Sequence, residues 1–301
     1  MRAAFHSAIQ SLPHSVLNHL AATPLAAPCF HLVADQCPPH VRHLYPSRTP
    51  ERFQADLDWL LRRFRPVGLD DLTACVRNGR PFPKNSAFLS FDDGFREMYE
   101  IVAPICLRKG VPATFFLATA FLDNRELCYR HKASLLMDRS GSAEFLKVTY
   151  RRRKMLDDAA VALNVDFDDY LRRHQPYLTT NQVNSLRSQG FTIGGHSVDH
   201  PPYAELILGE QLEQTRRCLA AFQPRARAFA FPFVSTGINR QFYHAVFAES
   251  LAEIIFCIGD MPTGYGNRLV QRFGVEDGRD MPLNRRWREE AGKSFRARLP
   301  R

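Results

Sequence analysis

Two adjacent carboxylates follow an apolar segment in the stretch SAFLSFDDGF, residues 86–95. Residues 87–91 are almost all apolar and predict a buried strand, and Asp92 and Asp93 come directly after it. Neighbouring carboxylates repel each other, and burial beside a strand removes their hydration, so a folded protein must supply them with partners. The pair therefore predicts a site that holds a cation or activates a proton donor.

Two histidines four residues apart form the second chemical signal, in the stretch GGHSVDHPPY. If a helical turn begins at His196, the imidazoles of His196 and His200 lie on one face and can share a metal ion. The double glycine before them suits a sharp turn at the end of a strand. The alternative is a loop with two solvent-exposed histidines.

Strand and helix patterns alternate along the chain and predict parallel strands with right-handed crossovers. One helix has Thr49 as its N-cap and Pro50 at its first position. About seven strands favour a barrel over an open sheet. We expect strands over residues 30–33, 87–91, 112–119, 191–196, 228–231, 252–257 and 268–275, and helices over residues 50–64, 70–79, 97–109, 181–189, 205–222 and 240–249.

The carboxyl ends of parallel barrel strands meet at one face, so the Asp pair and the His pair are expected to converge. Two imidazoles and one carboxylate make a three-ligand metal site with a position left for water. The second aspartate then lies beside the ion, where it accepts a proton from the water.

Composition and charge limit the partners and the compartment. The formal net charge is +9, and its densest run, residues 151–154, predicts a solvated helix face rather than a nucleic-acid site, because no aromatic residues alternate with the charges. Seven scattered cysteines without a C-x-x-C pair favour a reducing compartment. Asn18, His19 and Pro24 interrupt the N-terminal apolar run, so we expect a cytoplasmic protein without stable membrane insertion, with an exported protein as the alternative. The oligomeric state is left open.

The motifs SFDDG, HSVDH and FAFPF, in this order, resemble those of the polysaccharide deacetylase family, also called the NodB homology domain or carbohydrate esterase family 4. The resemblance covers residues 30–276. It implies a NodB-like α/β fold, a distorted (β/α) barrel of seven or eight parallel strands. We expect an N-terminal extension with poor order over residues 1–28, the barrel over 29–277 with a mostly helical insertion at 122–180, and a charged C-terminal tail over 278–301.

The resemblance also implies a hydrolase that acts on carbon–nitrogen bonds other than peptide bonds and removes an acetyl group from an N-acetylated sugar. Asp92 matches the catalytic base, and Asp93, His196 and His200 match the metal ligands. Ser197 matches the residue that braces the histidine loop by a hydrogen bond. The metal is usually zinc, with cobalt, nickel or manganese as variants.

Two positions depart from the family pattern. The third motif lacks the arginine that orients the base in many relatives, and Arg272 near the end of the chain is the candidate to replace it, with an ordinary surface arginine as the alternative. The late histidine that acts as the acid is also missing, because no histidine follows His244. Some relatives with permuted motifs use an early histidine, which makes His31 the candidate acid; a structural histidine is the alternative.

Two aromatic residues complete the predicted site. The backbone N–H near Phe233 is expected to stabilise the oxyanion, and Tyr203 is expected to border the pocket.

Two other functions remain open at this stage. The first is a cytoplasmic metal-dependent amidase for a small non-sugar amide. The second is a carbohydrate-binding descendant of the fold without catalysis, which the presence of the base and all three ligand residues disfavours.

Overall fold

The computed structural model describes residues 25–222, 224, 226–276 and 281–296. Within this part of the chain, eight strands form one sheet that curves into a nearly closed barrel. The strands, in sheet order, are β10 (Leu269–Gln271), β9 (Ile254–Cys257), β8 (Ala228–Ala230), β7 (Thr192–Gly195), β6 (Ala113–Leu117), β5 (Leu89–Phe91), β2 (Pro28–Phe30) and β11 (Phe273–Gly274).

Each neighbouring pair in this sheet is parallel, which confirms the predicted distorted (β/α) barrel with seven or eight strands. The sheet begins at β10 and ends at β11, and Arg272 alone separates these two strands in the chain. Arg272 thus lies at the seam where the barrel comes closest to closing. A short parallel sheet of β1 (Leu25–Ala26), β4 (Ser86–Ala87) and β3 (Arg65–Pro66) adjoins the barrel, because one residue separates β1 from β2 and one separates β4 from β5.

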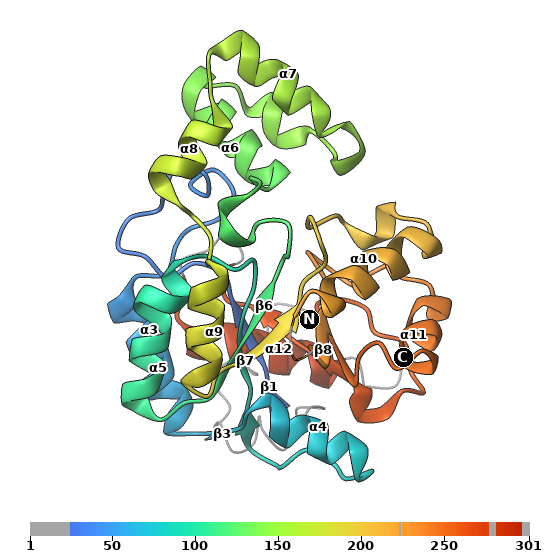
Figure 1. Ribbon diagram of the computed structural model, residues 1–301. Coiled ribbons are helices and arrows are strands. Elements are labelled where there is room, and N and C mark those ends of the chain that lie inside the picture. The colour runs from blue at the N-terminus through green and yellow to red at the C-terminus, as the bar shows by residue number, and fades with distance from the viewer. Residues whose placement is uncertain (1–24, 223, 225, 277–280, 297–301) are drawn as a thin grey trace.

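Helices surround the barrel, and their ends follow the sequence signals (Figure 1). The hydroxyl of Thr49 accepts a bond from the backbone N–H of Arg52, so the predicted N-cap is confirmed. Thr179 and Gln182 form a capping box at the start of α9. The surrounding helices are α3 (Pro50–Leu61), α4 (Leu69–Arg77), α5 (Ala103–Lys109), α9 (Thr180–Ser188), α10 (Leu208–Ala220), α11 (Arg240–Ala248) and α12 (Leu283–Arg296), with a π-helical turn η1 (Met98–Val102) leading into α5.

The insertion is mostly helical, as predicted, and rises above one end of the barrel in Figure 1. Its apolar residues share one core with the barrel residues Leu32, Phe95 and Phe121. The insertion is therefore packed against the end of the barrel where strands β2, β5 and β6 terminate. Its helices are η2 (Leu122–Asn124), α6 (Tyr129–Ser140), η3 (Ala143–Lys147), η4 (Tyr150–Arg152), α7 (Lys154–Leu163) and α8 (Phe167–His174).

One predicted domain boundary needs a correction. Residues 25–28 were assigned to the extension, but they are buried in β1, β2 and the residue between them; residues 1–24 lie outside the described part. The predicted charged tail contains the helix α12 over residues 283–296, and the ring of Trp287 lies 6.2 Å from that of Trp59 on α3. The apolar residues among the charges explain this helix, because they give it a face to bury.

The double glycine before His196 serves close packing rather than a turn. Gly194 and Gly195 lie within β7, and a Cβ on Gly194 would stand 2.3 Å from the ring of Phe116. Only glycine fits at such a distance. Among the described residues, no helix has both the length and the apolar character needed to cross a bilayer.

Candidate active site

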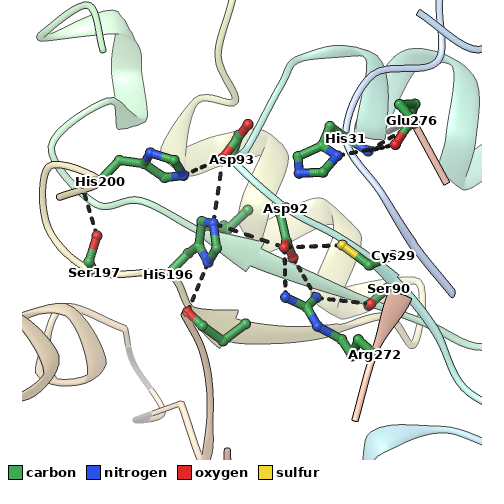
Figure 2. Close-up of polar contacts among 12 residues, drawn as sticks. Cys29, His31, Ser90, Asp92, Asp93, His196, Ser197, His200, Arg272 and Glu276 are labelled. Carbon is green, nitrogen blue, oxygen red and sulfur yellow. Dashed lines mark hydrogen bonds and ion pairs between the residues drawn. The ribbon is translucent and has the colours of Figure 1, made fainter. Parts of the chain in front are cut away.

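Both motifs lie at the carboxyl ends of their strands and converge as predicted (Figure 2). Asp92 and Asp93 follow β5, and His196 follows β7. Asp93 and Gly94 adopt φ angles of 76° and 84°, a left-handed turn that aspartate tolerates better than most residues and glycine adopts freely. This turn ends the strand and directs the two carboxylates to different partners.

Asp93, His196 and His200 form a buried cluster. Asp93 Oδ1 lies 3.0 Å from His200 Nε2 and 3.5 Å from His196 Nε2. The four-residue spacing suggested that the two histidines share a helical turn, but the structure has no helical turn there. The segment after β7 is a loop in which Ser197 and His200 have φ angles of 69° and 60°, and the hydroxyl of Ser197 accepts a 3.0 Å bond from the His200 backbone N–H. Ser197 thus braces the loop as the resemblance implied.

The donor atoms of this cluster fit a divalent ion. The imidazole of His196 is hydrogen-bonded through Nδ1 to the backbone oxygen of Ala230 at 2.9 Å, which places the proton on Nδ1 and leaves the Nε2 lone pair free. Asp93 Oδ1 is buried and has no hydrogen-bond partner in the described structure, although two imidazoles face it. Burial alone raises the pKa of Asp93, but the charge of His200 and the hydrogen bonds of both histidines hold it well below its ordinary value. Three buried donor atoms that face one another within 4.8 Å are what a metal site requires.

Asp92 is buried beside this cluster and held by a buried arginine. Arg272 donates two bonds of 2.7 Å, one to each carboxylate oxygen, and a third of 3.1 Å to Ser90 Oγ. The thiol of Cys29 donates to Asp92 Oδ2 at 3.2 Å, and His196 Nε2 lies 4.0 Å from the same oxygen. Burial raises the pKa of Asp92, but the charge and hydrogen bonds of Arg272, together with the neighbouring His196 and His31, lower the pKa below its ordinary value. Asp92 is therefore ionised at neutral pH, and Arg272 is an internal partner rather than a surface residue.

His31 follows β2 and lies on the same face of the barrel, where Glu276 holds it (Figure 2). Its Nδ1 lies 3.1 Å from Glu276 Oε2, and its backbone N–H donates to Glu276 Oε1, also at 3.1 Å. Burial alone lowers the pKa of His31, but the hydrogen bond and charge of Glu276 outweigh it and raise the pKa to about 9. The side chain is 24% exposed, so the imidazole is reachable from outside while it stays charged.

The two predicted aromatic residues have different positions. Phe233 lies at the rim of the site, with its ring 4.7 Å from that of His200 and 39% of its surface exposed. Tyr203 was predicted to border the pocket, but it lies in the core. It is fully buried, its hydroxyl is hydrogen-bonded to Thr215 Oγ1 at 3.0 Å, and its ring packs against Phe231.

Comparison with known proteins agrees with this geometry. The sequence pattern named polysaccharide deacetylase matches residues 79–242, which is more than half of the chain. The chain belongs to the polysaccharide deacetylase family. It is thus a deacetylase-type hydrolase of carbon–nitrogen bonds other than peptide bonds, from a metal-dependent family. No curated protein sequence matches the chain significantly.

Solved structures share the fold of this polysaccharide deacetylase at low identity. The deacetylase PplD of Streptococcus pyogenes, solved with acetate, has 14% identity and a TM-score of 0.59 over 87% of this chain and 96% of its own. IcaB from Ammonifex degensii has 15% identity and a TM-score of 0.60 over 90% and 98%. A de-N-acetylase from Aggregatibacter actinomycetemcomitans has 15% identity and a TM-score of 0.59 over 88% and 99%.

Three residues at the site were absent from the sequence prediction. Cys29 is two positions before His31, and alternate residues of a strand point to one face, so the strand period offered a signal for Cys29. Glu276 follows the last barrel strand, where its position at a strand end was the only hint. Tyr45, whose hydroxyl donates to Asp93 Oδ2 at 3.2 Å, lies in a long loop without a periodic pattern and gave no signal.

Proposed function

We propose that this protein removes the acetyl group from an N-acetylated sugar by metal-assisted hydrolysis. The observation that carries this proposal is the set of buried donor atoms on Asp93, His196 and His200 beside the Asp92–Arg272 pair. The ends of β5 and β7 supply both the metal ligands and the proton acceptor. The attacking water and the acyl carbon of the substrate can therefore meet there with little reorganisation of the protein.

Asp93 Oδ1, His196 Nε2 and His200 Nε2 would hold the ion. One carboxylate and two neutral imidazoles suit zinc, and cobalt, nickel or manganese accept similar donors. When bound, the ion supplies a Lewis acid that polarises the acetyl carbonyl and increases the acidity of a water molecule.

Asp92 would accept the proton of the attacking water. Its Oδ2 faces the donor cluster, 4.0 Å from His196 Nε2, and Arg272 keeps the carboxylate ionised and fixed in its plane. The arginine thus has the orienting role that the third motif does not provide in this sequence.

His31 would donate a proton to the leaving amine. Because Glu276 raises its pKa to about 9, the imidazole is charged at neutral pH and can act as an acid. The Phe233 backbone N–H would stabilise the oxyanion, and the exposed part of its ring offers a surface for the apolar face of a sugar. Ser197 keeps the loop that carries His200 in place.

The substrate class is supported by the family and by the solved relatives. One relative was solved with acetate and another is described as a de-N-acetylase. An N-acetyl group on a polysaccharide, an oligosaccharide or a carrier-linked sugar has the same bond to cleave. The compartment in which the protein works stays a prediction from the sequence.

Acetate release from a panel of N-acetylated sugars tests this proposal. We expect release that a chelator abolishes, that added Zn²⁺ restores, and that Asp92→Asn removes. Asp58→Asn is the control, because Asp58 pairs with Lys109 on the outer helices. Bound metal without acetate release from any sugar would refute the sugar substrate and favour a small non-sugar amide.

A further inference from the structure

Tyr45 contacts the carboxylate that would bind the ion, on the side away from the histidines. Its hydroxyl donates to Asp93 Oδ2 at 3.2 Å, while Asp93 Oδ1 faces His196 and His200 (Figure 2 shows Asp93 and the two imidazoles). The hydroxyl thus decides which oxygen points to the metal position. Tyr45 lies outside the residues matched by the family pattern.

The loop that carries Tyr45 is closed at its base. Ala34 donates its backbone N–H to Arg48 O at 2.9 Å, and Arg48 donates its own to Leu32 O, also at 2.9 Å. These bonds bring the two ends of residues 34–48 together next to β2. The span between them, here named the Tyr45 loop, has one β-bridge at its base, between Val33 and Arg48, and its residue Val41 is buried in one core with Leu32 and Phe95. Its far part also has polar support.

The insertion supplies that support. Ser134 on α6 donates its hydroxyl to the backbone oxygen of Pro39 at 2.7 Å, and Asp138 on the same helix accepts a 3.0 Å bond from Arg42. Tyr170 on α8 is hydrogen-bonded to Nδ1 of His40 at 2.9 Å. The Tyr45 loop is therefore attached to the insertion on one side and to Asp93 on the other.

We propose that Tyr45 is a positioning residue for the metal centre, and that the insertion braces the metal centre through the Tyr45 loop. This inference rests on the proposed role of Asp93 as a metal ligand. A ligating carboxylate whose second oxygen is hydrogen-bonded has one orientation, whereas a free one rotates and presents either oxygen. Removal of such outer partners lowers metal affinity about 10- to 100-fold.

Titration of the chelator-stripped full chain with Zn²⁺ tests the role of Tyr45. We expect Tyr45→Phe, which removes only the hydroxyl, to raise the dissociation constant by about 10-fold or more while the metal-free protein keeps the circular dichroism spectrum of the folded wild type. Tyr265→Phe is the matched control, because it removes a hydroxyl that donates an equally long bond, 3.2 Å, to the backbone oxygen of Arg240. Because this bond involves no metal ligand, the control should bind Zn²⁺ within about 2-fold of the wild type.

A double-mutant cycle tests the bracing by the insertion. Ser134→Ala, which is remote from the ligand atoms, should raise the Zn²⁺ dissociation constant by a smaller factor than Tyr45→Phe. It should add nothing in the Tyr45→Phe background, because its effect passes through the hydroxyl. Additive effects of the two substitutions would overturn the bracing.

A third variant separates this inference from the proposed function. Asp93→Ala should abolish stoichiometric Zn²⁺ binding. Retained binding in Asp93→Ala would refute the proposed metal site itself. Lost binding in Asp93→Ala together with wild-type affinity in Tyr45→Phe would refute only the role of Tyr45. If Tyr45→Phe does not fold, Ser134→Ala alone decides the inference, and wild-type affinity there would overturn it.

Discussion

The pair of Asp92 and Arg272 allows a quantitative test of the site. Both side chains are almost fully buried, with 2% and 0% exposure, and two bonds of 2.7 Å join them. Arg272→Met replaces the guanidinium with an uncharged chain and leaves a buried carboxylate without its cation. Breaking a buried pair in this way costs about 3–5 kcal/mol of folding free energy.

Asp92→Asn alone leaves the buried guanidinium without its anion and should also be costly. The double variant contains neither charge, so its loss of stability should be smaller than the sum of the single losses by about 2–3 kcal/mol. Because the pKa of Asp92 is lowered in the folded protein, the pair stabilises above the ordinary carboxyl pKa of 3.8 and loses this contribution as the pH falls through the lower folded value.

Urea unfolding of the metal-free variants at pH 7, followed by circular dichroism, measures these free energies. Acetate release at the same pH should fall steeply in Arg272→Met as in Asp92→Asn, because Asp92 loses the two bonds that orient it and burial without the arginine raises its pKa. Additive single losses, or a loss below about 1 kcal/mol for Arg272→Met, would refute the assignment of a coupled buried pair.

Three further substitutions test other parts of the account. His31→Gln should lower turnover steeply and leave metal content unchanged; unchanged turnover would dismiss its role as the acid. Glu276→Gln removes the group that raises the pKa of His31, so the alkaline fall of kcat/KM in the metal-loaded enzyme should move to lower pH, and an unmoved profile would contradict this pairing. Gly194→Ala should destabilise the barrel by about 1–3 kcal/mol in urea unfolding, because its Cβ would meet the ring of Phe116. Gly274→Ala, with open space at its Cβ, is the control, and equal losses in both would argue against that close contact.

The sequence predicted the barrel and most of the site because both depend on local patterns. Apolar runs that end in Asp-Asp-Gly or Gly-Gly-His mark strand ends, and parallel topology brings those ends to one face. Arg272 was a weaker prediction, because its burial depends on the seam between β10 and β11, which no local pattern reveals.

Other features depend on tertiary packing. The loop at His196 is held by Ser197 and left-handed backbone, although four-residue spacing favoured a helical turn. Tyr203 is close to the ligands in sequence but packs into the core. Tyr45 reaches Asp93 only because the insertion and the closed base of its loop place it there.

X-ray absorption at the zinc edge tests the central claim most directly. Among the residues that the structure describes, two groups have metal-binding donors: Asp93 with His196 and His200, and Cys29 with His31 and Asp92. Arg272 occupies both oxygens of Asp92, which disfavours a cation in the second group. We predict one Zn²⁺ per chain with only nitrogen and oxygen ligands at about 2.0–2.2 Å. A sulfur ligand at about 2.3 Å would place the ion at Cys29 and contradict the account.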